Sequence, residues 1–150
     1  VMSLFEAQLT QLVALAILAP IVASQGGNAA TQTMTVAVRA LATQELGAWN
    51  IRRFFTRELI VALINGVAFA LITGVVAGIW FGNTGLGLVI AIAMVINLVA
   101  AGLAGVAIPF LLDRANIDPA VSSGTFVPTV TAVVGFFAFL GTATILLGLR

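Results

Sequence analysis

Three stretches of this chain carry no charged side chain, and each is longer than the roughly 20 residues that a helix needs to cross a bilayer. They cover residues 59–82, 85–112 and 120–149, and a fourth apolar stretch, residues 7–42, has a polar patch in its second half. All four are far longer than a membrane strand and lack strict alternation of polar and apolar residues. We therefore predict an all-α fold, a polytopic bundle with four transmembrane helices.

The amino-acid composition excludes several other classes of protein. Of the 150 residues, 61% are apolar and 7% are charged, whereas a soluble domain carries about 25% charged residues. A formal net charge of +1 offers no basic surface that could bind nucleic acid. Because the chain has neither His nor Cys, it lacks an imidazole base and thiolate ligands, and we do not expect an enzyme. An integral protein of the lipid bilayer remains.

The charged residues predict the topology. Arg39, Arg52, Arg53 and Arg57 lie between the cores of the first and second stretches, and Arg114 lies between the third and fourth. The turn between the second and third stretches is uncharged. The positive-inside rule then places the Arg-rich loops in the cytoplasm, with both termini of this chain outside an inner (plasma) membrane. Because no signal peptide precedes that outward N-terminus, we expect the chain to be a fragment of a longer membrane domain.

Two segments depart from a simple spanning helix. The first stretch exceeds one bilayer width, so we expect it to be broken, tilted or extended into the cytoplasm. Residues 43–58 interleave aromatic residues with Arg and Glu, which predicts an amphipathic helix at the cytoplasmic interface. A docking site for a cytoplasmic domain is the alternative interpretation of that segment.

The densest polar patch within the spans covers residues 24–33. Gly26 and Gly27 weaken the helix there and let another backbone or an ion come close. Pro20 lacks the amide that would bond the carbonyl of Ala16, so that oxygen could face a pore. Polar groups at membrane depth tend to mark pathways, and the patch predicts an ion or substrate path. A helix-packing seam is the alternative.

The last span repeats this pattern. Gly124, Pro128, Thr131 with Ala132, Gly135 and Phe139 follow one another at three- and four-residue steps, which places them on one face of a helix. That small, weakly polar face could line a narrow pathway, or it could be a packing face.

Other small and polar residues favour helix association. Gly74, Gly78 and Gly82 repeat every four residues, and Gly105 with Ala101 resembles that pattern, so we predict packing roles for these glycines. Asn65 and Asn97 are single amides, for which interhelical hydrogen bonds are more typical than ligand binding.

Oxygen ligands alone are available for an ion in these spans. Backbone carbonyls beside Pro and Gly, together with Asn and Thr oxygens, could hold a hydrated cation through its water shell, as Mg²⁺ prefers. Such an arrangement suits a channel better than a tight cage of protein ligands.

Several short motifs, in order along the chain, resemble the membrane domain of the MgtE family of Mg²⁺ channels. The first group is Phe5-Glu6, Pro20, Gly26-Gly27-Asn28, Gln32 and Arg39-Ala40-Leu41-Ala42-Thr43. The second group is Gly105, Pro109, Asp118-Pro119-Ala120, Thr129-Val130-Thr131 and Gly135-Phe136-Phe137. The resemblance covers essentially the whole chain.

The resemblance implies a homodimer whose domain has five transmembrane helices, of which this chain holds the last four and lacks the first. It implies a pore between subunits, lined by the first and fourth stretches described here, with Mg²⁺ as the transported and regulatory ion. A cytosolic N-terminal domain and a pair of CBS domains regulate full-length members and are absent from this sequence. Asp118 matches an acidic position at the cytoplasmic mouth that is associated with Mg²⁺-dependent closure.

One position departs from the family pattern. The fifth helix of the family usually carries an Asp that recognises hydrated Mg²⁺, and Ala132 stands at that position here. Loss of that carboxylate leaves two alternatives to Mg²⁺ conduction: a non-conducting membrane assembly or regulatory module, or a transporter of other divalent cations such as Co²⁺ or Ni²⁺. The residues that we predict to lie on the ion pathway are Ala16, Gly26, Gly27, Asn28, Thr31, Gln32, Gly124, Pro128, Thr129 and Ala132.

Overall fold

The computed structural model describes residues 13–43 and 48–148, apart from the side chains of residues 48–50 and 122. These residues form four long helices and no strand: α2 (Val13–Ala42), α3 (Ala48–Trp80), α4 (Thr84–Arg114) and α5 (Pro119–Leu146). Each helix contains a segment long and apolar enough to cross a membrane. The predicted all-α bundle with four spans is confirmed.

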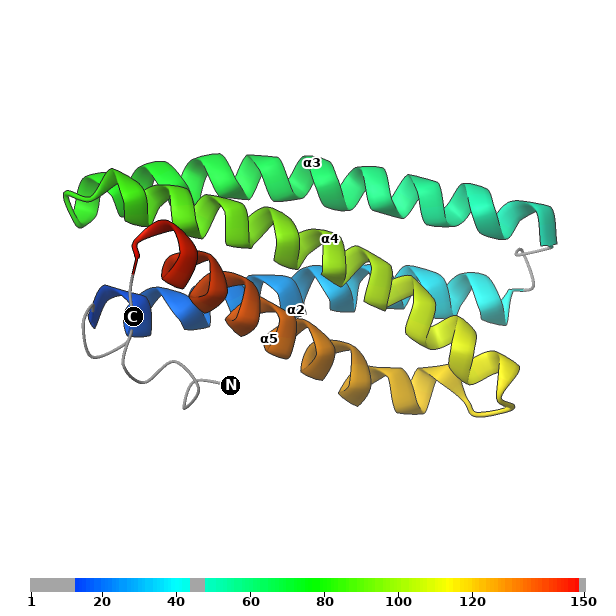
Figure 1. The fold of residues 1–150 in the computed structure, drawn as a ribbon. Coiled ribbons are helices and arrows are strands. Elements are labelled where there is room, and N and C mark those ends of the chain that lie inside the picture. The colour runs from blue at the N-terminus through cyan, green and yellow to red at the C-terminus, as the bar shows by residue number, and fades with distance from the viewer. Residues whose placement is uncertain (1–12, 44–47, 149–150) are drawn as a thin grey trace.

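The four helices run alternately up and down, and α4 lies at the centre of the bundle (Figure 1). It packs against α2, α3 and α5, and α2 also packs against α5, whereas α3 has an extended contact only with α4. As a result, 56% of the spanning window of α4 is buried but only 17% of that of α3. Most of α3 is therefore free to face lipid or another helix.

Helix α2 continues without a break through Pro20 and the Gly26-Gly27 pair. Its 30 residues correspond to about 45 Å of helix, which is longer than the roughly 30 Å hydrocarbon core. Of the three expected alternatives, a broken helix is therefore wrong, and a helix that is tilted or extends beyond the bilayer remains. Neighbouring helices enclose the glycine pair, since Gly26 is buried against α4 and Gly27 approaches α5.

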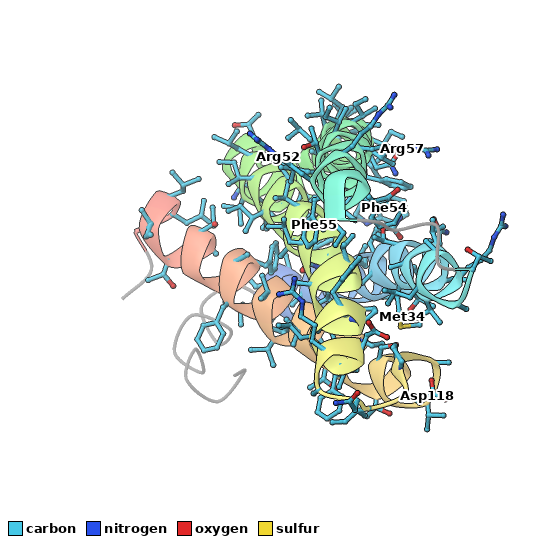
Figure 2. The ribbon with its side chains drawn as sticks, turned by 90° about the vertical axis from the view of Figure 1, so that its right-hand side faces the viewer. Met34, Arg52, Phe54, Phe55, Arg57 and Asp118 are labelled. Atoms are coloured by element: carbon cyan, nitrogen blue, oxygen red, sulfur yellow. The ribbon has the colours of Figure 1, made fainter. Side chains whose placement is uncertain are left out.

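Helix α3 also differs from the expectation. We predicted that residues 43–58 form a separate amphipathic helix, but α3 begins at Ala48 and runs directly into the membrane-spanning segment. Residues 44–47 lie outside the described residues. The Arg-rich segment is thus the first three turns of a spanning helix, at the end of the bundle where Asp118 also lies (Figure 2).

The turn between α3 and α4 explains the third glycine of the Gly74, Gly78, Gly82 repeat. Gly82 has φ of +60°, and no heavy atom lies within 4 Å of the position that its Cβ would occupy. The predicted packing role is wrong at Gly82, because glycine serves there as the left-handed residue that ends a helix. Asn83 follows as the N-cap of α4, and its side chain accepts a hydrogen bond from the amide of Leu86 at 3.1 Å.

The other glycines of the predicted packing set lie at helix–helix contacts. A Cβ on Gly74 would lie 2.9 Å from the carbonyl oxygen of Gly87, and Gly78 faces the same residue of α4. A Cβ on Gly105 would lie 2.8 Å from the carbonyl oxygen of Ala30. These distances leave no room for a side chain, so α4 approaches α3 and α2 through bare backbone.

Candidate ion pathway

Helix α2 has one face of exposed polar side chains. Successive steps of three or four residues place them on one side of the helix, whereas the residues packed toward α4 and α5 are small. The exposed polar residues on this side include Ser24, Asn28, Thr31 and Thr35, and the buried residues include Gly26, Ala30 and Ala37. A polar face is costly against lipid tails, so a partner or water should cover this one.

The threonine hydroxyl groups on this face direct their protons toward the backbone of their own helix. The Thr31 hydroxyl donates a hydrogen bond to the carbonyl oxygen of Gly27, and the Thr35 hydroxyl donates one to the carbonyl oxygen of Thr31; the oxygen–oxygen distance is 2.8 Å in each bond. On α5, the hydroxyl of the exposed Thr129 donates a hydrogen bond to the carbonyl oxygen of Thr125, also at 2.8 Å. The hydroxyl lone pairs therefore remain available to accept hydrogen bonds from the waters of a hydrated cation.

Helix α5 lies alongside α2 at this level. The Oγ1 atom of the fully buried Thr131 is 4.0 Å from the position of a Cβ on Gly27. Close by, Ala30 and Met34 of α2 pack with Val127 of α5, and Figure 2 shows Met34 on the side of α2 near the start of α5. Asn28, the residue after Gly27, is exposed, and Ala132, the residue after Thr131, is half-buried.

The contact divides the predicted face of α5 into two parts. Thr131, Gly135 and Phe139 are buried within the bundle, whereas Gly124 is exposed and Pro128 and Ala132 are half-buried. Thr129 lies on the exposed side as well. The part of the face that remains accessible is therefore the part that contains Ala132.

The predicted pathway residues of α2 do not all point in one direction. Ala16 is exposed, one turn before Pro20, together with Asn28 and Thr31. Gly26 faces α4 instead, where a Cβ would lie 2.2 Å from Nδ2 of Asn97. Gln32 is exposed but lines a cavity that α2 shares with α3 and α4. Asn28, Thr31, Thr129 and Ala132 thus all remain at least partly exposed, whereas Gly26 is buried against α4 and Gln32 lines the cavity beside α3.

Asn97 joins three helices in the middle of the bundle. Its side chain is fully buried, and Nδ2 donates a hydrogen bond to the carbonyl oxygen of Val22 at a distance of 2.7 Å. Gly26 of α2 and Gly135 of α5 both approach it so closely that a Cβ on either would clash. The prediction that Asn97 forms an interhelical hydrogen bond is confirmed.

Asp118 lies at the end of the bundle that carries the arginines (Figure 2). It is the N-cap of α5, and its Oδ1 accepts a hydrogen bond from the backbone amide of Ala120 at a distance of 2.9 Å. Pro119 then occupies the first position of the helix, where its missing N–H is harmless. Within the described residues no group of three or more His, Cys, Asp or Glu side chains could hold a metal ion, and Asp118 belongs to no such group.

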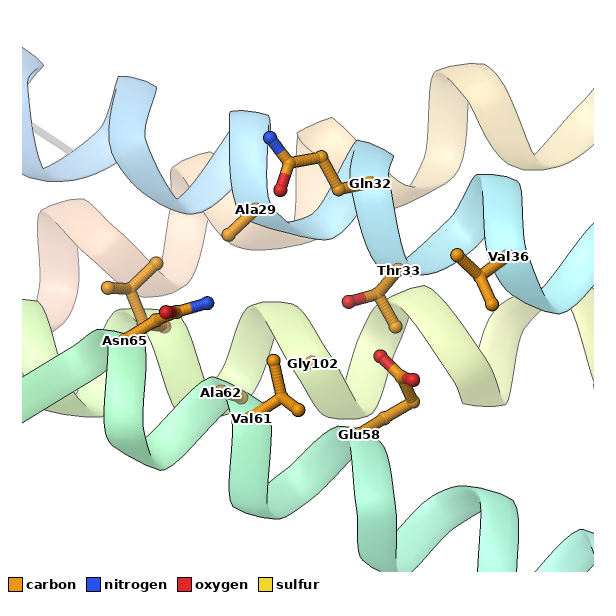
Figure 3. Close-up of a pocket in the computed structure, with 10 residues that line it drawn as sticks. Ala29, Gln32, Thr33, Val36, Glu58, Val61, Ala62, Asn65 and Gly102 are labelled. Carbon is orange, nitrogen blue, oxygen red and sulfur yellow. The ribbon is translucent and has the colours of Figure 1, made fainter.

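Sequence analysis missed one group of polar residues. Glu58 and Asn65 of α3 face Gln32 and Thr33 of α2 across a cavity (Figure 3). Sequence analysis placed Glu58 at the end of the predicted interfacial helix, outside the membrane span, because the uncharged stretch begins at Leu59. The spacing of seven residues between Glu58 and Asn65, two turns of one helix, would have pointed to a shared face had α3 been extended back past Glu58.

Comparisons with known proteins agree with the membrane architecture. A family model described as MgtE, divalent cation transporter, matches residues 19–142. The magnesium transporter MgtE of Bacillus subtilis is 33% identical over 144 residues, which is 96% of this chain and 32% of that protein. The proteins of the same name from Enterococcus faecalis and Thermus thermophilus are 34% and 37% identical over 93% and 95% of this chain, and over 31% and 32% of their own lengths.

The chain thus spans about a third of the length of the curated relatives that it matches. The matched region of the family model covers parts or all of α2, α3, α4 and α5. On these grounds the chain belongs to the MgtE family of divalent cation transporters.

Proposed function

We propose that this chain forms the membrane pathway of a Mg²⁺ channel or transporter, and that hydrated Mg²⁺ passes between two copies of the chain. The observation that carries this proposal is that exposed oxygen-bearing side chains lie on both α2 and α5, two helices that pack against each other near Gly27 and Thr131. The relatives named as magnesium transporters supply the choice of ion.

The chemistry of the two faces suits a hydrated cation. Thr31 and Thr129 direct their protons to their own helices, so that hydroxyl oxygens and the Asn28 side-chain oxygen can accept hydrogen bonds from coordinated water. Mg²⁺ is reluctant to lose its waters and is usually bound with several of them in place. Neutral oxygens that contact the water shell let the ion bind and leave again, as conduction requires.

A second copy of the chain is the simplest cover for these faces. Exposed polar groups at membrane depth are tolerated when they face protein or a water-filled cavity. A twofold axis beside α2 and α5 would place the polar face of one protomer opposite that of its partner, because twofold symmetry pairs identical surfaces. The path would then be lined by both copies.

Ala132 determines how selective such a path can be. With Ala at this position, no carboxylate from the half-buried part of α5 faces the ion. Two carboxylates near a divalent ion would contribute several kcal/mol of attraction even at an effective dielectric constant near 20. The proposed path should therefore discriminate weakly among divalent cations, and Co²⁺ or Ni²⁺ should also pass.

The orientation and partners follow from the same proposal. The protein would lie in the inner membrane, and the end of the bundle that carries Arg52, Arg57 and Asp118 would face the cytoplasm. Asp118 would lie at the cytoplasmic mouth, where a CBS-type regulatory domain of the full-length protein could close the path when Mg²⁺ is abundant.

The experiment is Mg²⁺ uptake into proteoliposomes that contain the full-length protein, compared with its Ala132→Asp variant. Uptake that increases or becomes more selective for Mg²⁺ in the variant supports a path at Ala132. A non-conducting membrane module is the second candidate, favoured by the absence of a carboxylate at position 132, and absence of uptake in both proteins would support it.

A further inference from the structure

A cavity of about 190 Å³ lies between α2, α3 and α4, near the end of the bundle that carries the arginines (Figure 3). Helix α2 contributes Gln32 and Thr33, α3 contributes Glu58 and Asn65, and α4 contributes Gly102. The other lining residues, Ala29, Val36, Val61, Ala62 and Leu98, are apolar, so the four polar side chains are the groups that set this cavity apart from the apolar surface along the rest of α3.

The cavity exists because α2 and α3 both pack on α4 but not extensively on each other. On one side, a Cβ on Gly102 would lie 2.6 Å from the Cβ of Ala62 in α3. On the other side, a Cβ on Gly105 would lie 2.9 Å from the Cβ of Thr33 in α2. Two close approaches to one helix therefore leave a wedge between α2 and α3.

Glu58 supplies the only acidic side chain among the residues that line this wedge. It is only 9% exposed, and its carboxylate points into the cavity toward α2 (Figure 3). Within the described parts of the chain no residue forms a hydrogen bond or an ion pair with that carboxylate. A carboxylate that is so little exposed and has no protein partner needs a cation or ordered water in the cavity to satisfy it.

Thr33 and Asn65 also have polar atoms available inside the cavity. On α2, the hydroxyl groups of Thr31 and Thr35 donate hydrogen bonds to carbonyl oxygens of their own helix. Thr33, which lies between them in sequence, makes no such bond within the described residues. Figure 3 shows the Thr33 hydroxyl and the Asn65 amide directed into the same space as the Glu58 carboxylate. One negative charge and several neutral polar groups from two helices thus line the same cavity.

We propose that this cavity binds a divalent cation together with part of its water shell, with Glu58 as the charged group. A volume of about 190 Å³ corresponds to about six waters at roughly 30 Å³ each, so a largely hydrated ion fits. Gln32, Thr33 and Asn65 contact its waters. A site with one carboxylate has weak affinity, because the number of charged ligands tunes affinity for hard cations.

The site is distinct from the proposed pathway. Thr31 and Asn28 lie on the exposed face of α2, whereas Gln32 and Thr33 lie on the side toward α3 and α4. The cation links α2 to α3, two helices that have no other extended contact, and so fixes the position of the helix that carries Asn28. Only the choice of a divalent ion rests on the proposed function.

Binding of Mn²⁺ to the full-length protein tests this site without any measurement of transport. This part of the protein has no Cys, so once any Cys elsewhere in the full-length protein is replaced, an Ile60→Cys variant accepts a nitroxide label at an exposed position near Glu58. Mn²⁺ in the cavity should broaden the nitroxide spectrum, and Mg²⁺ should reverse the broadening. In the Glu58→Gln background, binding should weaken by about tenfold or more, because the only charge is removed.

Asp113→Asn is the matched control, since Asp113 is an exposed acid on α4 that does not line the cavity; it should leave the broadening unchanged. If Glu58→Gln fails to fold, Thr33→Val keeps the carboxylate and should weaken binding by a few-fold. Unchanged broadening in Glu58→Gln overturns the proposal, as does reversal by Na⁺ at equal concentration. If the unmodified protein binds Mn²⁺ in this way but takes up no Mg²⁺, that result contradicts the proposed pathway and leaves the proposed cavity site standing.

Discussion

The Nδ2 atom of Asn97 in α4 donates a hydrogen bond to the carbonyl oxygen of Val22 in α2, 75 residues earlier in the sequence. The bond lies in a fully buried position between Gly26 and Gly135, which leave no space for side chains of their own. Because α4 is the helix that every other helix packs against, this contact fixes the position of α2 relative to the centre of the bundle. The polar face of α2 depends on that position.

Replacement of Asn97 should destabilise the bundle. Asn97→Ala removes the bond to Val22, which is worth about 0.6 kcal/mol and at most about 1.7 kcal/mol inside a membrane, and it leaves a cavity besides. Asn97→Asp places an acceptor against the Val22 carbonyl and should cost more. Thermal unfolding of the detergent-solubilised protein measures both. Asn65→Ala is the control, since Asn65 has no hydrogen bond within the described residues; an equal loss in that variant would contradict the role assigned to Asn97.

The two glycines beside Asn97 should tolerate no side chain. A Cβ would lie 2.2 Å from Asn97 Nδ2 at Gly26 and 2.7 Å at Gly135. Gly26→Ala and Gly135→Ala should each destabilise the protein by about 1–3 kcal/mol through overpacking. Gly141→Ala provides the comparison, because no atom lies within 4 Å of its Cβ position and Ala favours a helix by up to about 1 kcal/mol. Equal midpoints for all three variants would show that the packing around Asn97 is wrong.

Asp118 should show two separable roles. Asp118→Asn keeps a good N-cap and removes the charge, whereas Asp118→Ala also removes the hydrogen bond to the Ala120 amide. We expect Asp118→Ala to lose about 0.5–2 kcal/mol of stability and Asp118→Asn to lose little. If the charge also serves closure by Mg²⁺, then Asp118→Asn should shift the Mg²⁺ dependence of uptake without a change in thermal stability. An unchanged dependence would limit Asp118 to its capping role.

The hydroxyl groups of Thr31 and Thr129 should matter for transport more than for stability. Replacement by Val keeps the shape and exchanges an oxygen that faces the proposed path for a methyl group. Thr31→Val and Thr129→Val should lower Mg²⁺ uptake several-fold. Thr73 of α3 makes the same kind of bond, to the carbonyl oxygen of Phe69 at 2.7 Å. It lines a pocket with Ile21 of α2, nearly three turns before Thr31, so Thr73→Val should leave uptake unchanged. Equal effects at all three positions would contradict a path at the α2–α5 contact.

The sequence predicts the number and order of the helices well, because long uncharged runs leave few alternatives in a membrane. It predicts helix ends less well. Hydropathy changes at Leu59, but hydrogen bonding within the helix does not, so α3 extends back to Ala48 through charged residues. For the same reason Glu58 was assigned to the wrong kind of segment.

Sequence periodicity also cannot decide which neighbour each face of a helix meets. Gln32 and Thr31 are adjacent in the polar patch, yet one lines the cavity beside α3 and the other faces outward. Gly82 continues the spacing of Gly74 and Gly78 but ends the helix. These differences depend on contacts between segments far apart in the sequence, such as Asn97 with Val22, which one sequence alone does not contain.

Mg²⁺ uptake by proteoliposomes with Ala132 replaced tests the central claim, a cation path beside the α2–α5 contact. The protein is compared with its Ala132→Asp variant and with Ala132→Asn, which has a similar size and no charge. We predict uptake in all three, with a higher preference for Mg²⁺ over Na⁺ only in Ala132→Asp, because a carboxylate attracts the divalent ion more strongly. Uptake that is the same in rate and selectivity for all three proteins, or absent from all of them, would contradict the claim.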